Sequence, residues 1–382
     1  MVQNPLAAQN LVTTLHLETP VREIKLNCQS LQKRRARLNQ NMVSKIGEKL
    51  SENELCPPNL LTGQEEAFEN DIQTLLLTRI REFVQVNCPA CDSSDAPSIF
   101  TKYELQFVRC ATCFTIFMNP RPSEAVLADY YKCSKSYRYW AEKIFPASEQ
   151  ARKSKIHEPW YAQVKKYCRN NELSMNTLLE VGAGFGTFCS VAKEAGDFRK
   201  IIAIEPTPSL ANHCRSRRLE VLEMRIENVP EGTIEADIAV SFEVIEHTFE
   251  PRLFLKAISS CLKPGGLVVL SCPNGEGFDI VMLGNNSPAV DAEHINLFNP
   301  GSLKILLNDC GFEVLEITTP GRLDAEFVRE AALAGTLDLS TDPFLKRTLI
   351  EEWDRLGWPF QTFLAENGLS SHMWILARRI EI

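Results

Sequence analysis

Residues 177–187 read TLLEVGAGFGT, which is a short apolar strand, three closely spaced glycines and the first residue of a helix. Gly182, Gly184 and Gly186 lack a Cβ, so the backbone can turn sharply here and pass close to a ligand. A glycine-rich turn between a strand and a helix is shared by several nucleotide-binding classes, dehydrogenases among them. By itself the turn predicts a nucleotide-like ligand and leaves the class of protein open.

Two acidic residues near the turn narrow the choice of ligand. Glu180 precedes Gly182 by two positions, where a carboxylate would repel a pyrophosphate but can hold an ammonium group through water or backbone. Glu205 ends the next predicted strand, where it can accept hydrogen bonds from both hydroxyls of a ribose. We therefore expect a cofactor with a ribose and a cationic amino-acid portion. The alternative for Glu205 is an acid at the surface end of a strand.

Apolar strands alternate with helix-length segments in the second half of the chain. Five strands are expected, in TLLEVGAG (177–184), KIIAIEP (200–206), LEVLEM (219–224), DIAVSFEV (237–244) and GLVVLSCPN (266–274). This rhythm predicts a parallel sheet covered by helices on both faces. Two further strands, FEVLEIT (312–318) and HMWILARR (372–379), are separated by about 50 mostly helical residues.

Four motifs resemble, in order and spacing, the class I S-adenosylmethionine-dependent methyltransferases. They are EVGAGFG (180–186), IEP (204–206), DIAVSFEVIEH (237–247) and LKPGGLVVLSCPN (262–274). The resemblance implies an α/β fold with a Rossmann-like seven-stranded sheet that binds S-adenosylmethionine at the carboxyl ends of its strands. It also implies that the three glycines cradle the methionine part, that Glu205 holds the ribose, and that HMWILARR is the last strand of a terminal antiparallel hairpin.

Two cysteine pairs precede this region, Cys88 with Cys91 and Cys110 with Cys113, and residues 92–109 put 18 positions between them. Tetrahedral zinc binds four thiolates at about 2.3 Å, and a two-residue gap lets one tight turn present both thiolates of a pair. The pattern predicts a structural zinc ribbon whose four positions are all filled by protein. The alternatives are a redox pair or unconnected thiols. The other cysteines of the total of 13 are scattered, which is typical of buried thiols in a reducing compartment.

Composition and hydrophobic periodicity divide the chain into four regions. We expect a helical N-terminal extension at 1–84, a zinc-ribbon module at 85–122, an aromatic and helical connector at 123–171, and the methyltransferase domain at 172–382 with a helical insertion at 320–370. An insertion that carries its own structure is commonly a lid or a binding element. We expect it to border the acceptor pocket opposite Tyr137–Trp140; the alternative is a dimerisation element, so a homodimer stays open.

A narrower resemblance takes in the cysteine module, the segment FMNPRPS (117–123) and the methyltransferase core together. The combination is similar to enzymes that methylate nucleotide-linked sugars or surface-glycan precursors. In sugar C-methyltransferases of this kind, a Tyr-x-Glu-His segment after the fifth strand supplies the base. This chain has Asp291-Ala-Glu293-His294, without the tyrosine, and lacks room for their extra C-terminal domain. Both departures leave the methylated atom open.

Methyl transfer needs an aligned acceptor and, for a hydroxyl or carbon acid, a group that removes a proton. The candidates are His294 with Glu293 in the loop after the fifth strand, and His247 after the fourth strand. The alternative for His294 is a histidine that anchors its loop to the following helix. The alternative for His247 is that Glu246-His247 closes this strand whatever the acceptor.

The overall composition and charge limit which partners and which location we expect. The 382 residues are 44% hydrophobic and 24% charged, with a net charge of −8, which argues against a broad nucleic-acid footprint. The N-terminal residues MVQNPLAAQN lack the pattern of a signal peptide, and no apolar run approaches the roughly 18 residues of a membrane span, so we expect a cytoplasmic protein. The expected acceptor is a sugar nucleotide or glycan precursor. Another small metabolite or lipid-linked precursor is the alternative, and an RNA base read by the zinc ribbon is less favoured.

Overall fold

The computed structural model describes residues 50–380. The first 49 residues of the predicted 1–84 extension lie outside the described residues. Between residues 50 and 82 the chain forms helices α2 (Glu52–Leu55) and α3 (Pro58–Asp71), followed by the helical turns η1 (Ile72–Leu76) and η2 (Leu77–Glu82).

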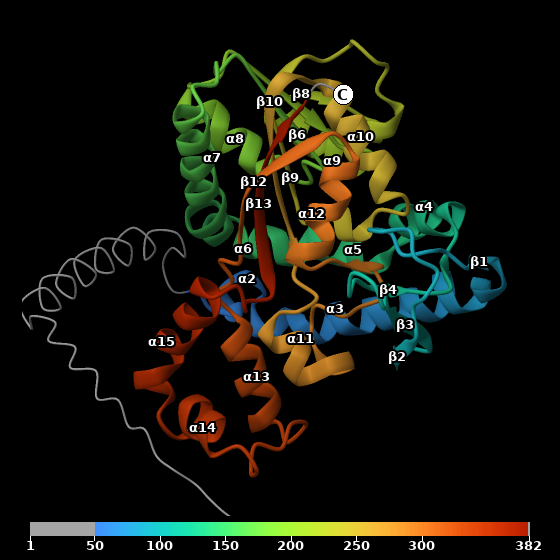
Figure 1. Ribbon diagram of the computed structural model, residues 1–382, viewed down its shortest axis with the longest axis vertical. Helices are drawn as coiled ribbons and strands as arrows, with labels where there is room; N and C mark the ends of the chain where they lie inside the picture. Colours follow the sequence, from blue (N-terminus) through green and yellow to red (C-terminus); the bar gives the residue numbers. More distant parts are fainter. Residues whose placement is uncertain (1–49, 381–382) are drawn as a thin grey trace, which may run out of the picture. The chain divides into compact units, whose positions relative to one another are not determined.

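Seven strands form the central sheet, in the order β12-β13-β10-β9-β6-β7-β8 (Figure 1). They are β6 (Thr177–Val181), β7 (Lys200–Ile204), β8 (Glu220–Leu222), β9 (Ala236–Phe242), β10 (Leu262–Pro273), β12 (Phe312–Thr318) and β13 (His372–Arg379). β13 is antiparallel to both its neighbours, and the other pairs are parallel. The predicted α/β fold with a mixed sheet is confirmed. The strand order reverses at β6, and open sheets of this kind bind ligands at the carboxyl ends of the strands beside such a point.

The sheet is covered on both faces because successive residues of a strand point in opposite directions. Leu178, on one face, belongs to the apolar cluster of α7 (Glu158–Asn170) and α8 (Thr187–Ala195). Leu179, on the other, belongs to the cluster of α10 (Pro251–Cys261) and α12 (Pro300–Asp309) (Figure 1). A third, smaller cluster joins α8 to α9 (Pro208–Ser216).

The cysteine module builds a second sheet of four strands, in the order β11-β4-β3-β2. They are β2 (Ser98–Lys102), β3 (Leu105–Arg109), β4 (Ile116–Met118) and β11 (Asn296–Leu297). β11 comes from far along the chain, directly after the loop that carries His294, and pairs antiparallel with β4. A two-stranded pair, β1 (Phe83–Val84) with β5 (Arg121–Pro122), closes the module. The module is therefore hydrogen-bonded to a segment that follows β10 of the central sheet.

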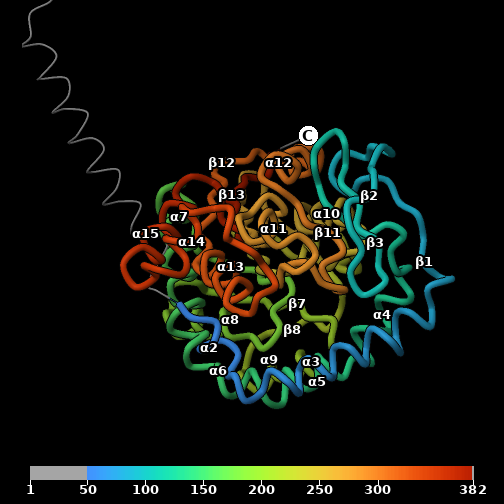
Figure 2. Tube along the Cα trace, turned by 90° about the horizontal axis from the view of Figure 1, so that it is seen from below, coloured from blue at the N-terminus to red at the C-terminus, as the bar shows by residue number. Residues whose placement is uncertain are grey.

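The connector is a run of short helices and helical turns that lies beside α3. It comprises α4 (Glu124–Cys133), α5 (Lys135–Tyr139), η3 (Trp140–Ile144), α6 (Phe145–Arg152) and η4 (Lys153–His157). Figure 2 shows α3 running along α5. The buried Asp71 at the end of α3 accepts hydrogen bonds from Ser134 Oγ at 2.6 Å and from the Ser136 amide at 2.8 Å, which caps α5. A Cβ at Gly63 would lie 2.5 Å from the Tyr139 hydroxyl, so the tyrosine ring lies directly against the backbone of α3 here.

Residues 320–370 form helices α13 (Asp324–Leu333), α14 (Pro343–Lys346) and α15 (Trp353–Glu366), with the turn η8 (Arg347–Glu351) between the last two. They share an apolar cluster with α11 (Phe278–Leu283), which leads through η7 (Gly284–Asn286) to the loop of His294 (Figure 1). The buried Asp324 accepts hydrogen bonds from Gln361 Nε2 at 2.7 Å and Ser370 Oγ at 2.5 Å, which fastens the insertion to the start of β13. Among residues 50–380, no helix combines the length and the apolar character that crossing a membrane requires.

Candidate active site and cysteine cluster

The three glycines after β6 all have positive φ, at 78°, 54° and 69°, but for different reasons. A Cβ at Gly182 would lie 2.5 Å from Val244 Cγ2, and one at Gly186 would lie 2.7 Å from Leu219 Cδ1. These two glycines let the turn pack against neighbouring segments. A Cβ at Gly184 would meet no atom within 4 Å. Gly184 therefore faces open space, where a ligand can approach the backbone.

Both acidic residues near the turn are buried, each with 4% of its surface exposed. Glu205 accepts hydrogen bonds from the amides of Gly184 and Thr207, both at 2.8 Å, and thereby lies at the edge of the turn. Glu180 accepts a hydrogen bond from the Cys189 amide in α8 at 3.1 Å. Burial raises the pKa of Glu180 to about 8. Glu180 therefore stabilises the first turn of α8, whereas Glu205 lies at the edge of the glycine turn.

The aromatic run of the connector divides between two places. Phe185, inside the glycine turn, stacks on Phe145 of α6 with ring centroids 3.6 Å apart. The ring centroids of Trp140 and Phe185 lie 5.2 Å apart. The guanidinium of Arg152 also contacts Trp140, 4.9 Å from the centroid of its ring. Three residues earlier, Tyr137 packs edge-on to Tyr131 at 5.5 Å. One end of the segment thus covers the glycine turn, and the other end reaches a tyrosine cluster.

That tyrosine cluster surrounds Glu293. Tyr130 donates a hydrogen bond to Glu293 Oε1 at 2.7 Å, and Tyr131 packs edge-on to Tyr130 at 5.6 Å. Burial and the neighbouring Asp291 raise the pKa of Glu293 to about 7, although the Tyr130 hydrogen bond opposes the shift. The sequence lacks a tyrosine two residues before Glu293, but the connector brings tyrosines to this carboxylate from another part of the chain. The only sequence signal for this was the aromatic composition of the connector.

The two predicted histidines meet across the loops that follow β9 and β10. Their ring centroids lie 4.8 Å apart. His247 Nδ1 contacts the Glu293 carbonyl at 3.1 Å, and His294 Nδ1 contacts the Ala289 carbonyl at 2.8 Å. Burial and the neighbouring His294 lower the pKa of His247 to about 3, so this ring is neutral. Burial lowers the pKa of His294 as well, but Asp291 and the Ala289 carbonyl outweigh it and the pKa is raised overall.

Sequence reasoning did not single out Glu246, which completes this group. It lies in the turn η6 (Ile245–His247) directly after β9 and is 1% exposed. Its Oε1 is 3.9 Å from His247 Nε2, and neither carboxylate oxygen has a hydrogen-bond partner in the described part of the chain. The preceding Glu243 has a φ of 54°, a strained conformation for a non-glycine residue that redirects the chain at the end of β9.

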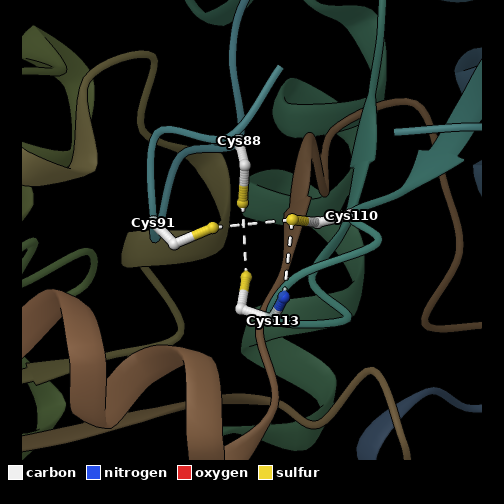
Figure 3. Close-up of side chains that lie close together, drawn as sticks. All are labelled: Cys88, Cys91, Cys110 and Cys113. Atoms are coloured by element: carbon white, nitrogen blue, oxygen red, sulfur yellow. Dashed lines mark hydrogen bonds between the residues drawn. The ribbon is translucent and has the colours of Figure 1, made fainter. Parts of the chain in front are cut away.

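The four cysteines of the module converge on one point (Figure 3). The sulfur atoms of Cys88 and Cys113 are 3.4 Å apart, those of Cys91 and Cys110 are 3.5 Å apart, and all four lie within 4.8 Å of one another. Zinc with bonds of about 2.3 Å separates its tetrahedral ligands by about 3.8 Å, so the donor set and spacing fit a zinc ion. The amides of Thr112 and Cys113 point at Cys110 Sγ, at 3.4 and 3.5 Å, which stabilises negative charge on that sulfur.

The cysteine module contacts the segment that directly follows His294. The Met118 amide donates to the Ile295 carbonyl at 3.0 Å, and Asn299 Nδ2 donates to the Cys113 carbonyl at 2.9 Å. Residues 295–299 are therefore held from both ends by the module, directly after His294. The cluster can fix this loop without touching a substrate.

Comparison with known proteins agrees with this architecture. Residues 136–317 match the family described as "Methyltransferase domain". A probable S-adenosylmethionine-dependent methyltransferase of Mycobacterium tuberculosis is 28% identical over 158 residues, which are 41% of this chain and 54% of that protein. A ubiquinone biosynthesis O-methyltransferase of Nitrobacter winogradskyi is 29% identical over 123 residues, 30% of this chain and 46% of that protein. The chain thus spans about half the length of the curated relatives it matches.

Among solved structures, an S-adenosylmethionine-dependent methyltransferase of Clostridium acetobutylicum superposes with a TM-score of 0.42 and 12% identity, over 64% of this chain and 99% of that one. The family match and the curated relatives support an S-adenosylmethionine-dependent methyltransferase domain at residues 136–317. These relatives' names include no sugar acceptor, so the sugar-nucleotide or glycan substrate stays a prediction.

Proposed function

We propose that the protein transfers the methyl group of S-adenosylmethionine to a hydroxyl oxygen of a small polar acceptor. The observation that carries this proposal is the contact between the two halves of the site. Val244, at the end of β9, packs against Gly182 of the cofactor turn, and Glu246 and His247 follow within three residues. A methyl donor over Gly184 and an acceptor at the histidine loop are therefore neighbours.

The chain's own residues supply the remaining requirements of such a transfer. Gly182, Gly184 and Gly186 admit the cofactor, and Glu205 at the edge of the turn is placed to accept from its ribose hydroxyls. The connector covers the turn through Trp140 and Phe145, which excludes water from that side. In-line attack on a sulfonium needs alignment above all, since the donor is already activated.

The acceptor is held among Glu293, His294 and His247, whose polar atoms are partly buried beside the connector tyrosines and can take part in removal of a hydroxyl proton. A sugar nucleotide or glycan precursor presents such hydroxyls. A phenolic or quinol-type metabolite is the second candidate, favoured by the match to ubiquinone biosynthesis O-methyltransferases.

An RNA substrate fits the module poorly. Its two basic residues between 86 and 120 are engaged within the protein: Lys102 donates to the Ser287 carbonyl at 3.0 Å, and Arg109 stacks 4.9 Å over Phe114. Two basic residues, of which Arg109 also lies 3.6 Å from Glu276, offer little attraction to a phosphate backbone, which is where nucleic-acid affinity mostly arises.

The acceptor class is tested by incubating the protein with S-adenosylmethionine carrying a labelled methyl group and separate panels of sugar nucleotides, phenolic metabolites and RNA. We expect label on a small hydroxyl-bearing molecule, in an ether that resists mild base. Label on RNA alone, or on a nitrogen of the small acceptor, would overturn the proposal. The Gly184→Val variant serves as the blank.

A further inference from the structure

We propose that Glu246, His247 and His294 bind a divalent transition metal ion such as zinc, at a site separate from the four cysteines. One ligand atom from each of these residues lies within 4.8 Å of the others. Two of the residues are in η6 after β9, and the third is in the loop before β11. A metal at this place would join the two loops that end at the acceptor side of the sheet.

The carboxylate of Glu246 is the strongest sign that something is bound here. It is 1% exposed, and both of its oxygens lack a hydrogen-bond partner among residues 50–380. An ionised carboxylate buried without a partner costs several kcal/mol, so such a group is paired, metal-bound or protonated. His247 Nε2, the near nitrogen, is 3.9 Å from Oε1, which is too far for a hydrogen bond. A cation between them would satisfy both atoms.

Hydrogen bonds orient both imidazole rings so that Nε2 is available to bind a metal. Each Nδ1 is directed at a backbone carbonyl, that of Glu293 for His247 and that of Ala289 for His294. A carbonyl can only accept, so each Nδ1 carries its proton and donates it. When the ring is neutral, its Nε2 presents a lone pair to an ion. Carbonyls that orient the far nitrogen in this way are the usual outer partners of metal-binding histidines.

The ligand set and spacing favour a first-row transition metal over magnesium or calcium. Two imidazoles with one carboxylate suit zinc, iron or manganese, whereas magnesium and calcium take oxygen ligands. Around an ion with bonds of about 2.1 Å, neighbouring ligands lie about 3.0–3.5 Å apart, so a small inward rotation of the side chains closes the site. Three protein ligands leave a coordination position open, unlike the four cysteines.

The role of this ion rests on the proposed function. A hydroxyl oxygen at the open position would lose its proton more readily, because a metal stabilises the alkoxide. With both imidazoles held by the ion, the proton would pass to Glu293 or to water. The oxygen then forms a bond to the methyl carbon, the carbon–sulfur bond breaks, and sulfur keeps the electron pair as S-adenosylhomocysteine is released. The contact of Val244 with Gly182 places this oxygen beside the cofactor turn.

The test measures metal content without any acceptor or turnover, so its outcome does not depend on the proposed function. The full-length protein is equilibrated with zinc, desalted and analysed for metal. We expect two zinc ions per chain in the wild type, and one in Glu246→Gln and in His294→Asn. His213→Asn, a half-buried histidine of α9, is the matched control and should keep two.

Cobalt distinguishes the two sites in case a variant is damaged. Thiolate-bound cobalt absorbs through sulfur-to-metal charge transfer, whereas cobalt on imidazole and carboxylate shows only weak ligand-field bands. Glu246→Gln should lose the weak bands and keep the charge-transfer band, and Cys110→Ser should do the reverse. A wild type that binds a single ion, lost only on cysteine substitution, would show that Glu246 is simply a buried neutral acid and would overturn the proposal.

Discussion

Single side chains in this protein are placed in environments that set their protonation. Glu180 is the clearest case, because burial beneath the cofactor turn raises the pKa of its carboxyl to about 8. Since the folded-state pKa is raised, the folded protein retains a proton that the unfolded chain releases. The stability associated with this group is complete below the unfolded pKa near 4.5 and is lost as pH rises through about 8.

Glu180→Gln should therefore flatten the pH dependence of the free energy of unfolding between those two pH values. The amide keeps an oxygen that can accept from the Cys189 amide, so the variant should be more stable than the wild type at high pH, by up to a few kcal/mol. Urea unfolding at a series of pH values measures this. Parallel curves for the two proteins would mean that the carboxyl is not protonated in the fold.

Tyr130 and Glu293 make a second residue-scale test. Tyr130→Phe removes the 2.7 Å hydrogen bond to Glu293 and leaves the packing of the ring in place. We expect turnover to fall by on the order of tenfold or more, because the carboxylate loses its orientation, with unchanged affinity for S-adenosylhomocysteine. Tyr161→Phe, on α7, removes a comparable 3.0 Å bond to Asp197; this variant is the control and should retain full turnover. Equal losses in both variants would assign Tyr130 a purely structural role.

At the scale of elements, the pairing of β4 with β11 joins the cysteine module to the loop that carries His294. Cys110→Ser should remove zinc from the module and loosen residues 295–299. Displacement of a catalytic loop by an ångström costs on the order of a hundredfold in rate, so turnover should fall strongly while cofactor affinity holds. Elemental analysis, calorimetry and a turnover assay on one preparation check this. Cys133→Ser, an exposed cysteine of α4, should change none of the three.

The elements also show which parts of the fold the sequence predicts. Local periodicity and spacing predict the strands of the central sheet, the glycine turn and the cysteine pairs. Each of these features is determined by a short stretch of sequence. β11 has only two residues, Asn296 and Leu297, and its pairing with β4 joins segments far apart in the sequence. The approach of Tyr130 to Glu293 has the same character. Local patterns do not encode contacts of this range.

Glu246 escaped sequence reasoning for another reason. Its neighbour His247 was recognised from the Glu-His motif, but the significance of the carboxylate appears only with its burial and its lack of hydrogen-bond partners among the described residues. Glu180 shows the reverse: its position two residues before Gly182 predicts a ligand contact, which stays a prediction, and the structure adds its hydrogen bond from the Cys189 amide.

At the scale of the whole molecule, the helical insertion is attached to α11, which precedes the acceptor loop. Replacing residues 325–366 with a short glycine-containing turn should preserve cofactor binding and abolish methyl transfer, because α11 loses its support. Calorimetry, turnover and light scattering together decide the matter. Normal turnover of a monomeric shortened protein would contradict a role at the acceptor site, and loss of dimerisation alone would assign the insertion to subunit contact.

The account as a whole depends on the cofactor binding over Gly184, and calorimetry with S-adenosylhomocysteine tests this most directly. We predict one molecule bound per wild-type chain. Glu205→Ala should weaken binding by about 1.5–3 kcal/mol through lost charge-assisted hydrogen bonds. Gly184→Val should abolish binding, because its side chain enters the open space above the turn. Gly196→Val carries the same positive-φ strain at the end of α8 and should bind normally. Absence of binding to the wild type, or equal affinity in the Gly184 and Glu205 variants and the wild type, would contradict the account.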